Sequence, residues 1–210
     1  MMFMKQQEKL ETGTTTVGIV CKDAVILATE SKSTMGYLIS SKIAQKVYQV
    51  DDKIAITTAG GAGDTQALIR MLKAEINLYK NSRNSEFTVK ATGMLLSNIL
   101  NAYRYYPYMA MLIIGGHDRD GFHIYTIDPV GGLEEDKYAS TGSGSPFAYG
   151  VLENDFKEGL AKEEGVRLAV RAIRSARERD IFSGGKIVVM TIDKNGLELV
   201  PEEKIKELAK

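Results

Sequence analysis

The residues with the clearest chemical potential form a short threonine run near the start of the 210-residue chain, where Thr14, Thr15 and Thr16 follow Gly13. A threonine hydroxyl is a weak nucleophile until a neighbouring base removes its proton. If the bond between Gly13 and Thr14 is cut, Thr14 gains a free α-amine, whose unperturbed pKa of about 8 suits a general base near neutral pH. One residue then carries both nucleophile and base, so the run indicates a nucleophile that is dormant until the chain is cleaved.

Gly13 fits this interpretation. Because glycine lacks a Cβ atom, its backbone can fold back tightly, so that the Thr14 hydroxyl reaches the Gly13 carbonyl and converts the amide to an ester that water opens. The Thr14 methyl group restricts the χ1 torsion and helps to aim the oxygen. A simpler alternative is that GTTT only begins a β-strand, because threonine favours strands and glycine favours their ends. The motif alone leaves both open.

Other catalytic devices have few residues to draw on. The chain holds one cysteine, Cys21, and two histidines, His117 and His123. A histidine triad would have to recruit one of these two, and His123 falls in an alternating strand pattern that is typical of a structural or surface histidine. A single cysteine excludes an intrachain disulfide, and its spacing from the histidines matches no familiar zinc site. We expect no metal and no cofactor.

The charge balance argues against two classes of partner. The 27 basic residues equal the 27 acidic residues in number, so no overall field attracts nucleic acid or an anionic membrane, and a basic strip studded with aromatics is missing. No run approaches the roughly 20 apolar residues of a membrane-spanning helix. The first residues turn polar after Met4, unlike a signal peptide. We expect a soluble cytoplasmic protein with a removable leader at 1–13 and one domain at 14–210.

Strand-type patterns occupy the beginning, middle and end of the chain. Lys22-Asp23 and Asp51-Asp52 separate the first two pairs, which predicts a compact antiparallel unit in the first quarter. Later turns are predicted at the glycine pair 131–132 and at Asn195-Gly196, where Asn-Gly accommodates positive φ at both turn positions. The predicted strands lie at 15–21, 24–30, 46–50, 53–58, 109–116, 122–128, 186–192 and 197–200.

Helical patterns fall between these strands in two pairs. The first helix follows the glycine-rich AGGAGD with Asp64 as its N-cap, the second ends ahead of Pro107, and the third begins at Pro146, which a first helical turn tolerates. The apolar faces of the first, second and fourth helices predict buried positions. For the first these are Leu68, Leu72, Ile76 and Tyr79; for the second, Val89, Leu95, Leu96, Ile99, Leu100 and Tyr103; and for the fourth, Val166, Val170 and Ile173.

The order of strands, two helices, strands, two helices and strands predicts an α+β fold. One stable way to bury such elements is to pack two antiparallel sheets between two helical layers. No internal repeat, low-complexity tract or linker divides the chain.

Several segments, the threonine run among them, carry a resemblance over nearly the whole chain. They are TGTTTVGI at 12–19, AVILATES at 24–31, the lone Lys46, ITTAGGAGD at 56–64, YASTGSGSPFAYGVL at 138–152 and RDIFSGG at 179–185. In this order they resemble the proteasome β-subunit, specifically its active archaeal type. The resemblance implies a four-layer αββα sandwich, the N-terminal nucleophile hydrolase fold, and a threonine-type endopeptidase that degrades unfolded proteins to short peptides with broad specificity.

The same resemblance implies roles for individual residues. Thr14 becomes the amino-terminal nucleophile once 1–13 has been removed by self-cleavage. Lys46 matches the catalytic lysine, whose positive charge favours the deprotonated hydroxyl and amine, and Glu30 orients it from a position where many relatives have aspartate. Without the motifs, Lys46 and Glu30 would pass for a solvated surface pair. The backbone N–H of Gly60 faces the developing oxyanion, and the remaining polar positions are Ser143, Asp180 and Ser183.

The implied substrate lies extended and adds a strand against backbone of the site. Its backbone pairs with Thr34, Gly60 and Ala62. The pocket for the residue before the cut is shaped by Ser33, Ala44 and Thr58. Ala44 and Thr58 are small, which suggests a roomy apolar pocket.

The glycine-rich AGGAGD is no phosphate loop, because the GK[ST] ending is missing.

The implied assembly has two stacked rings of seven such subunits, capped by rings of proteasome α-subunits and supplied with unfolded protein by an AAA ATPase. Two related alternatives remain. A bacterial two-ring ATP-dependent peptidase of the same superfamily usually has its threonine directly after the initiator, whereas this chain carries a leader ending in Thr12-Gly13. A non-catalytic ring subunit typically lacks the threonine or the lysine, and both are present here.

Overall fold

Two five-stranded antiparallel sheets form the centre of the computed structural model, which describes residues 13–209. The first sheet has the strand order β10 (Tyr138–Thr141), β1 (Thr16–Val20), β2 (Val25–Glu30), β11 (Ile187–Asp193) and β12 (Gly196–Leu199). The second has the order β5 (Val47–Asp51), β6 (Ile54–Gly60), β7 (Ala110–Asp118), β8 (Gly121–Ile127) and β9 (Leu133–Asp136). A separate hairpin, β3 (Ser33–Met35) and β4 (Leu38–Ser41), projects beyond them.

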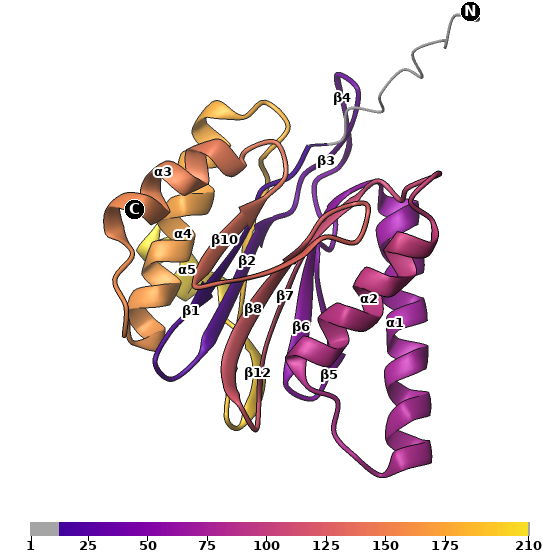
Figure 1. The fold of residues 1–210 in the computed structure, drawn as a ribbon. Coiled ribbons are helices and arrows are strands. Elements are labelled where there is room, and N and C mark those ends of the chain that lie inside the picture. The colour runs from indigo at the N-terminus through magenta and orange to yellow at the C-terminus, as the bar shows by residue number, and fades with distance from the viewer. Residues whose placement is uncertain (1–12, 210) are drawn as a thin grey trace, which may run out of the picture.

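Helices cover the outer faces of both sheets (Figure 1). The second sheet is covered by α1 (Ala62–Arg83) and α2 (Val89–Ala102). The first is covered by α3 (Ser145–Asp155), α4 (Lys162–Arg179) and the short α5 (Glu202–Leu208). The four layers confirm the predicted αββα sandwich.

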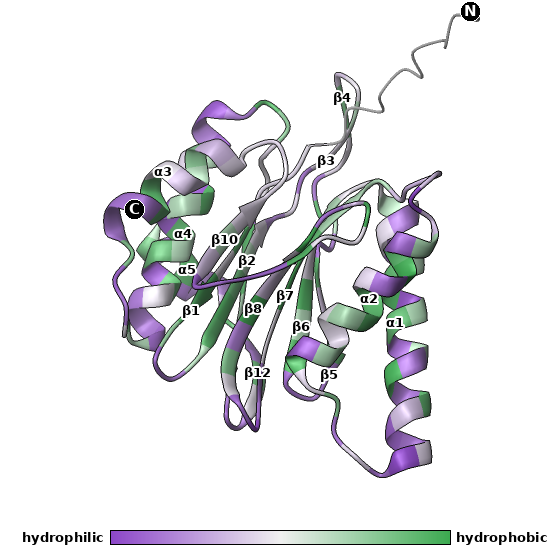
Figure 2. Cartoon of the chain, in the orientation of Figure 1, coloured by the Kyte–Doolittle hydropathy of each residue, from purple (hydrophilic) through white to green (hydrophobic). Residues whose placement is uncertain are grey.

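Three apolar layers hold the four structural layers together. One lies between the first sheet and α3, α4 and α5, a second between the other sheet and α1 and α2, and a third between the two sheets. Strand alternation produces this division, because neighbouring side chains in a strand point to opposite faces. In β2, Ile26 packs towards the helices while Leu27 packs between the sheets. Figure 2 shows apolar residues along the central strands and hydrophilic ones in the outer turns.

The predicted hairpins form, but one prediction about their grouping is wrong. β1–β2 and β5–β6 are both antiparallel pairs, yet they belong to different sheets rather than to one compact unit. The β3–β4 hairpin lies between them in the chain and was not predicted. Hairpin periodicity defines which strands pair locally, but it carries no information about which sheet each pair joins.

Two local predictions about α1 also differ from the structure. Gly61, not Asp64, is the N-cap of α1; the Asp64 carboxylate instead accepts the backbone N–H of Met109 at 2.8 Å. Tyr79 is 39% exposed rather than core and packs edge-on against Phe87.

The turn at Asn195-Gly196 joins β11 to β12 as predicted. Asp193 pairs with Gly196, so the two central turn positions are Lys194 and Asn195 rather than Asn195 and Gly196. Of these turn residues, Gly196 alone has a positive φ.

The helix predictions hold for most of their apolar positions. The buried positions are Leu68, Leu72, Ile76, Val89, Leu96, Leu100, Val166, Val170 and Ile173. Leu95 and Ile99 are partly buried against the layer between α1, α2 and the second sheet. Tyr103 follows α2 as its C-cap and is 51% exposed, so it does not belong to the core. The short elements α5, β9 and β10 were not predicted from the sequence.

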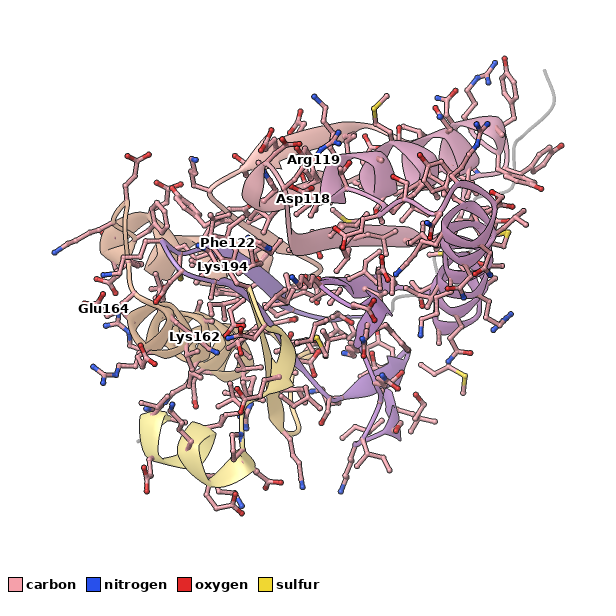
Figure 3. All side chains as sticks on the ribbon, turned by 90° about the horizontal axis from the view of Figure 1, so that it is seen from below. Asp118, Arg119, Phe122, Lys162, Glu164 and Lys194 are labelled. Carbon is pink, nitrogen blue, oxygen red and sulfur yellow. The ribbon has the colours of Figure 1, made fainter. Side chains whose placement is uncertain are left out.

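Strand direction brings distant chain segments to one end of the sandwich. β1 begins where β2 and β10 finish, and β5 begins near the finish of β6. This end carries the β3–β4 hairpin in Figure 1. Figure 3 shows the opposite end, where Arg119 and Lys194 lie in the turns of β7–β8 and β11–β12, and Lys162 and Glu164 at the start of α4.

Across the described residues, α-helical segments of the length and apolarity needed to span a bilayer are missing.

One pair of substitutions in α1 tests the assignment of the core. Leu72 is fully buried against the second sheet, whereas Leu78 on the same helix is 63% exposed. Leu72→Ala should lower the free energy of unfolding by about 2–5 kcal/mol, because it leaves a cavity, and Leu78→Ala by less than about 0.5 kcal/mol. Urea unfolding followed by circular dichroism measures both. Equal losses in the two variants would contradict the packing described.

Candidate active site

Thr14 lies just before β1 and is 4% exposed. Its hydroxyl Oγ1 donates a hydrogen bond to the carbonyl oxygen of Gly13 at 2.6 Å. The nucleophile predicted from the sequence therefore rests against the carbonyl group of the bond predicted to be cut.

Gly13 occupies a position that only glycine fits. A Cβ atom there would lie 1.6 Å from Cβ of Phe182 and 2.9 Å from Oγ of Ser143. The backbone N–H of Gly13 donates to Oγ1 of Thr34 on β3 at 3.5 Å. Gly13 is thus pressed between the segment after α4 and the β3–β4 hairpin, so its requirement is close approach rather than an unusual φ.

A buried ion pair supports the Thr14 hydroxyl. Lys46 precedes β5 and Glu30 ends β2, so the two sheets supply one partner each. The Lys46 Nζ donates to Thr14 Oγ1 at 3.0 Å and also contacts the Glu30 carboxylate. Lys46 is 7% exposed and Glu30 is 0% exposed. The pair thus joins both sheets directly beneath the candidate nucleophile.

The Glu30 carboxylate is satisfied on both oxygens. Oε1 faces Lys46 and accepts the backbone N–H of Thr15 at 3.4 Å. Oε2 accepts the backbone N–H groups of Lys32 at 2.6 Å and Gly184 at 3.0 Å. A fully buried carboxylate needs such donors, because burial without them is costly. The charge-assisted bonds fix Glu30, which in turn fixes the Lys46 ammonium.

Burial lowers the pKa of Lys46 below the ordinary lysine value of 10.5, while the nearby Glu30 carboxylate opposes that shift. The Lys46 ammonium also donates to the backbone carbonyl of Lys32. A lysine with a lowered pKa can exchange a proton with the Thr14 hydroxyl more readily than an exposed lysine can.

A second polar group surrounds the Thr14 backbone nitrogen. The Thr14 N–H donates to Ser143 Oγ at 3.2 Å, and Ser143 Oγ donates to Asp180 Oδ2 at 2.6 Å. Ser183 Oγ donates to the same Asp180 oxygen at 2.6 Å. Asp180 is the C-cap of α4, so the end of that helix places the carboxylate next to Thr14. The structure therefore brings together Thr14, Ser143, Asp180 and Ser183.

The loop that carries Ser143 approaches the Thr14 backbone closely because glycines flank the serine. Gly142 has φ +93°, and a Cβ atom on it would lie 2.0 Å from the Thr14 carbonyl oxygen. Steric exclusion at this position explains one glycine of the TGSGSP motif: the loop can touch Thr14 only without a side chain there.

A cleft of about 320 Å³ opens next to Thr14. Gly60 lies at its edge with φ +126°, where a Cβ atom would lie 2.0 Å from the Met109 carbonyl oxygen. The lining includes the substrate residues predicted from the sequence other than Thr34, whose side chain is buried behind Gly13. The lining residues are Gly13, Thr14, Ser33, Ala44, Gln45, Lys46, Tyr48, Thr58, Gly60, Ala62, Thr65, Gln66, Ile69 and Arg70.

Sequence reasoning missed the part of this lining that α1 contributes. Thr65, Gln66, Ile69 and Arg70 follow Ala62 at spacings of three and four residues, so they share one helix face. That periodicity could have identified them once Ala62 was assigned to the cleft. Gln66 and Arg70 make this wall more polar than the apolar pocket expected from Ala44 and Thr58.

The two histidines lie away from the cleft, near the β7–β8 turn at the opposite end of the sandwich. His123 Nδ1 is 2.7 Å from Glu135 Oε1, and the His117 ring packs on Phe122. Neither imidazole lies in the site that contains Thr14, so a histidine triad with this threonine is excluded.

Comparison with known proteins assigns this arrangement to a family. Residues 10–192 match the family model described as proteasome subunit. The chain is 50% identical over 200 residues to the proteasome subunit beta of Methanosarcina mazei, with 95% of each chain covered. It is 52% identical to the proteins of the same name from Ferroglobus placidus, over 93% of this chain and 94% of that one, and Archaeoglobus fulgidus, over 97% of each. The chain belongs to the proteasome subunit family, among its β-subunits.

Replacing Glu30 with Gln tests the buried ion pair, because it leaves the Lys46 ammonium without a counter-ion. We expect the free energy of unfolding to fall by about 3–5 kcal/mol and the pKa of Lys46 to fall further, since the charge that opposes the burial effect is gone. Between that lowered pKa and 10.5 the unfolded chain binds more protons than the folded one, so stability should rise with pH. Urea unfolding and the Lys46 ¹³Cε chemical shift measure these effects.

The matched control is Glu202→Gln, which removes a carboxylate from an exposed pair with Lys186 at 2.8 Å. Stability should change little, because solvent screens such pairs. If Glu30→Gln and Glu202→Gln behaved alike, the buried pair would lack the role assigned to it.

Proposed function

We propose that this chain is the proteolytic β-subunit of a 20S proteasome core, a threonine-type endopeptidase whose nucleophile is Thr14. One observation carries the proposal: the buried Thr14 hydroxyl lies between the Gly13 carbonyl oxygen, at 2.6 Å, and the Lys46 ammonium, at 3.0 Å. A threonine that only started a strand would need neither contact.

The first reaction is self-cleavage of the Gly13–Thr14 bond. Thr14 Oγ1 attacks the Gly13 carbonyl carbon, and collapse of the adduct transfers a proton to the Thr14 nitrogen, so that the amide bond breaks and an ester forms. Water then splits the ester and leaves a Gly13 carboxylate and a Thr14 with free hydroxyl and amine. In the uncut chain the Thr14 nitrogen is an amide and cannot act as a base, so Lys46 relays the proton.

After cleavage the α-amine of Thr14 becomes the general base. It removes the proton from Oγ1 as that oxygen attacks a substrate carbonyl, and it returns the proton to the departing amine; water then releases the acyl group from Thr14. The Lys46 charge favours the deprotonated forms of both groups, and the Gly60 N–H stabilises the oxyanion. Ser143, Asp180 and Ser183 hold the amine in position.

Substrate binds in the cleft as an extended strand. The backbone of Thr34, Gly60 and Ala62 pairs with it, while the side chain before the cut enters the space lined by Ser33, Ala44 and Thr58. Such backbone pairing is indifferent to most side chains, which agrees with degradation of unfolded proteins at broad specificity.

The working form is an assembly. Large apolar side chains are exposed at the site end of the described residues, including Tyr37 at 96%, Ile43 at 81% and Tyr106 at 89%, and apolar exposure of this kind is typical of interaction surfaces. Two stacked rings of seven copies between α-subunit rings, fed by an AAA ATPase, would cover such surfaces and confine the cleft. We place this particle in the cytoplasm.

Processing divides the chain into a leader at 1–13, of which residues 1–12 lie outside the described part, and a catalytic domain at 14–210. Neither related alternative is favoured. A non-catalytic ring subunit has no use for Thr14 beside a buried Lys46. The relatives that this chain resembles over nearly its whole length are archaeal β-subunits, which favours that type over the bacterial two-ring peptidase.

Intact-mass measurement of the assembled protein tests the proposal. The mature chain should begin at Thr14, and Thr14→Ala should keep residues 1–13 and lose peptide cleavage, because it lacks the attacking oxygen. Thr126→Ala, on β8 of the other sheet, is the matched control and should be processed and active. An active particle that retained its leader, or an active Thr14→Ala variant, would contradict the proposed function.

A further inference from the structure

We propose that Thr15 is a positioning residue that holds the Thr14 amine ready for peptide cleavage, through a chain of buried hydroxyl groups. The inference rests on the proposed function and adds to the site a residue that the sequence analysis assigned no role. Thr15 is 0% exposed, and its Oγ1 lies 2.6 Å from Ser183 Oγ.

The direction of each hydrogen bond follows from counting protons. Ser183 has one hydroxyl proton, and it points at Asp180 Oδ2, because a carboxylate only accepts. Ser183 Oγ must therefore accept its remaining bond, which makes Thr15 the donor. The Thr15 hydroxyl thus fixes the rotamer of Ser183 and, through it, one of the two serine bonds to Asp180.

The second serine bond extends the chain to the nucleophile. Ser143 has one proton too, and its 2.6 Å bond to Asp180 is shorter than its 3.4 Å contact with the Thr14 carbonyl oxygen, so the proton points at Asp180. Ser143 Oγ is then free to accept from the Thr14 nitrogen at 3.2 Å. Once the chain is cut, this nitrogen is the amine that must present its lone pair to Oγ1.

The backbone of Thr15 belongs to the other half of the site. Its N–H donates to Glu30 Oε1, the oxygen that pairs with Lys46. Thr15 is therefore bonded through its backbone to the group that supports the Thr14 hydroxyl, and through its side chain to the group that supports the Thr14 nitrogen. Substitution of the side chain separates the two functions, because the bond to Glu30 remains.

Close packing leaves the Thr15 hydroxyl one partner. A Cβ atom on Gly144 would lie 2.0 Å from Thr15 Oγ1, so the second glycine of the TGSGSP motif makes room for this oxygen. Thr16 provides a contrast: it is equally buried, but its hydroxyl pairs with Thr141 Oγ1 at 2.7 Å, between β1 and β10. Of these two hydroxyl groups, that of Thr15 is connected to Asp180, through Ser183, whereas that of Thr16 is not.

The two reactions of the site should respond differently to loss of this hydroxyl. Self-cleavage begins with an amide nitrogen and has no amine to orient, while the Lys46–Glu30 side remains intact. Thr15→Val should therefore still cut the Gly13–Thr14 bond at close to the normal rate. Turnover of peptides needs the oriented amine, so kcat should fall by about tenfold or more with KM within about twofold, since general-base catalysis contributes factors of this size or larger.

The experiment compares Thr15→Val, Thr15→Ser and Thr16→Val in the full chain, assembled as the wild type is. Leader removal is followed by intact mass, and kcat and KM are measured with a fluorogenic peptide. Thr15→Ser keeps the hydroxyl and should retain most of kcat, and Thr16→Val removes an equally buried hydroxyl outside the chain and should behave like the wild type.

Normal kcat in Thr15→Val would overturn the inference. Equal losses of self-cleavage and turnover in Thr15→Val, or equal losses in Thr15→Val and Thr16→Val, would also overturn it, because they indicate a packing role alone. These outcomes differ from failure of the proposed function, in which the wild type itself would lack a mature chain starting at Thr14.

Discussion

The site depends on one costly arrangement: a lysine ammonium and a glutamate carboxylate buried together between two sheets. Removing both charges from water is unfavourable, and the pair persists only because the surrounding donors and acceptors satisfy it. Glu30 receives bonds from Lys46 and from three backbone N–H groups, all of them outside its own strand. The strands and loops around the pair must keep their positions, because displacement of any of them leaves a charge unsatisfied.

This requirement explains the role of the αββα sandwich. Antiparallel strands bring the beginnings of β1 and β5 and the ends of β2, β6 and β10 to one end, so residues far apart in sequence meet around Thr14. Glycines complete the arrangement by close approach: Gly13 against Phe182, and Gly142 against the Thr14 backbone. Rigid sheets position the ion pair, whereas short loops position the serines and Asp180, so each half of the site has its own support.

Local sequence patterns predicted much of this, and their limits are physical. Alternation and helical periodicity identified most elements, and the motifs around Thr14 and Lys46 indicated the chemistry. Periodicity could not show that β1–β2 and β5–β6 join different sheets, because it indicates local pairing alone and both hairpins place apolar side chains in the layer between the sheets. Asp64 was misassigned as a cap, since a carboxylate near a helix start serves equally well as an acceptor for Met109. Thr15 had no visible role, because its partner Ser183 lies 168 positions away.

Covalent labelling with a peptide epoxyketone tests the central claim most directly, because this reagent forms its full adduct only where a hydroxyl and a free amine belong to the same residue. Peptide mapping of the labelled, assembled protein should place one adduct on Thr14 at the start of the mature chain, with peptide cleavage lost in proportion to labelling. An adduct on another residue, or full activity in particles labelled on Thr14, would contradict the account.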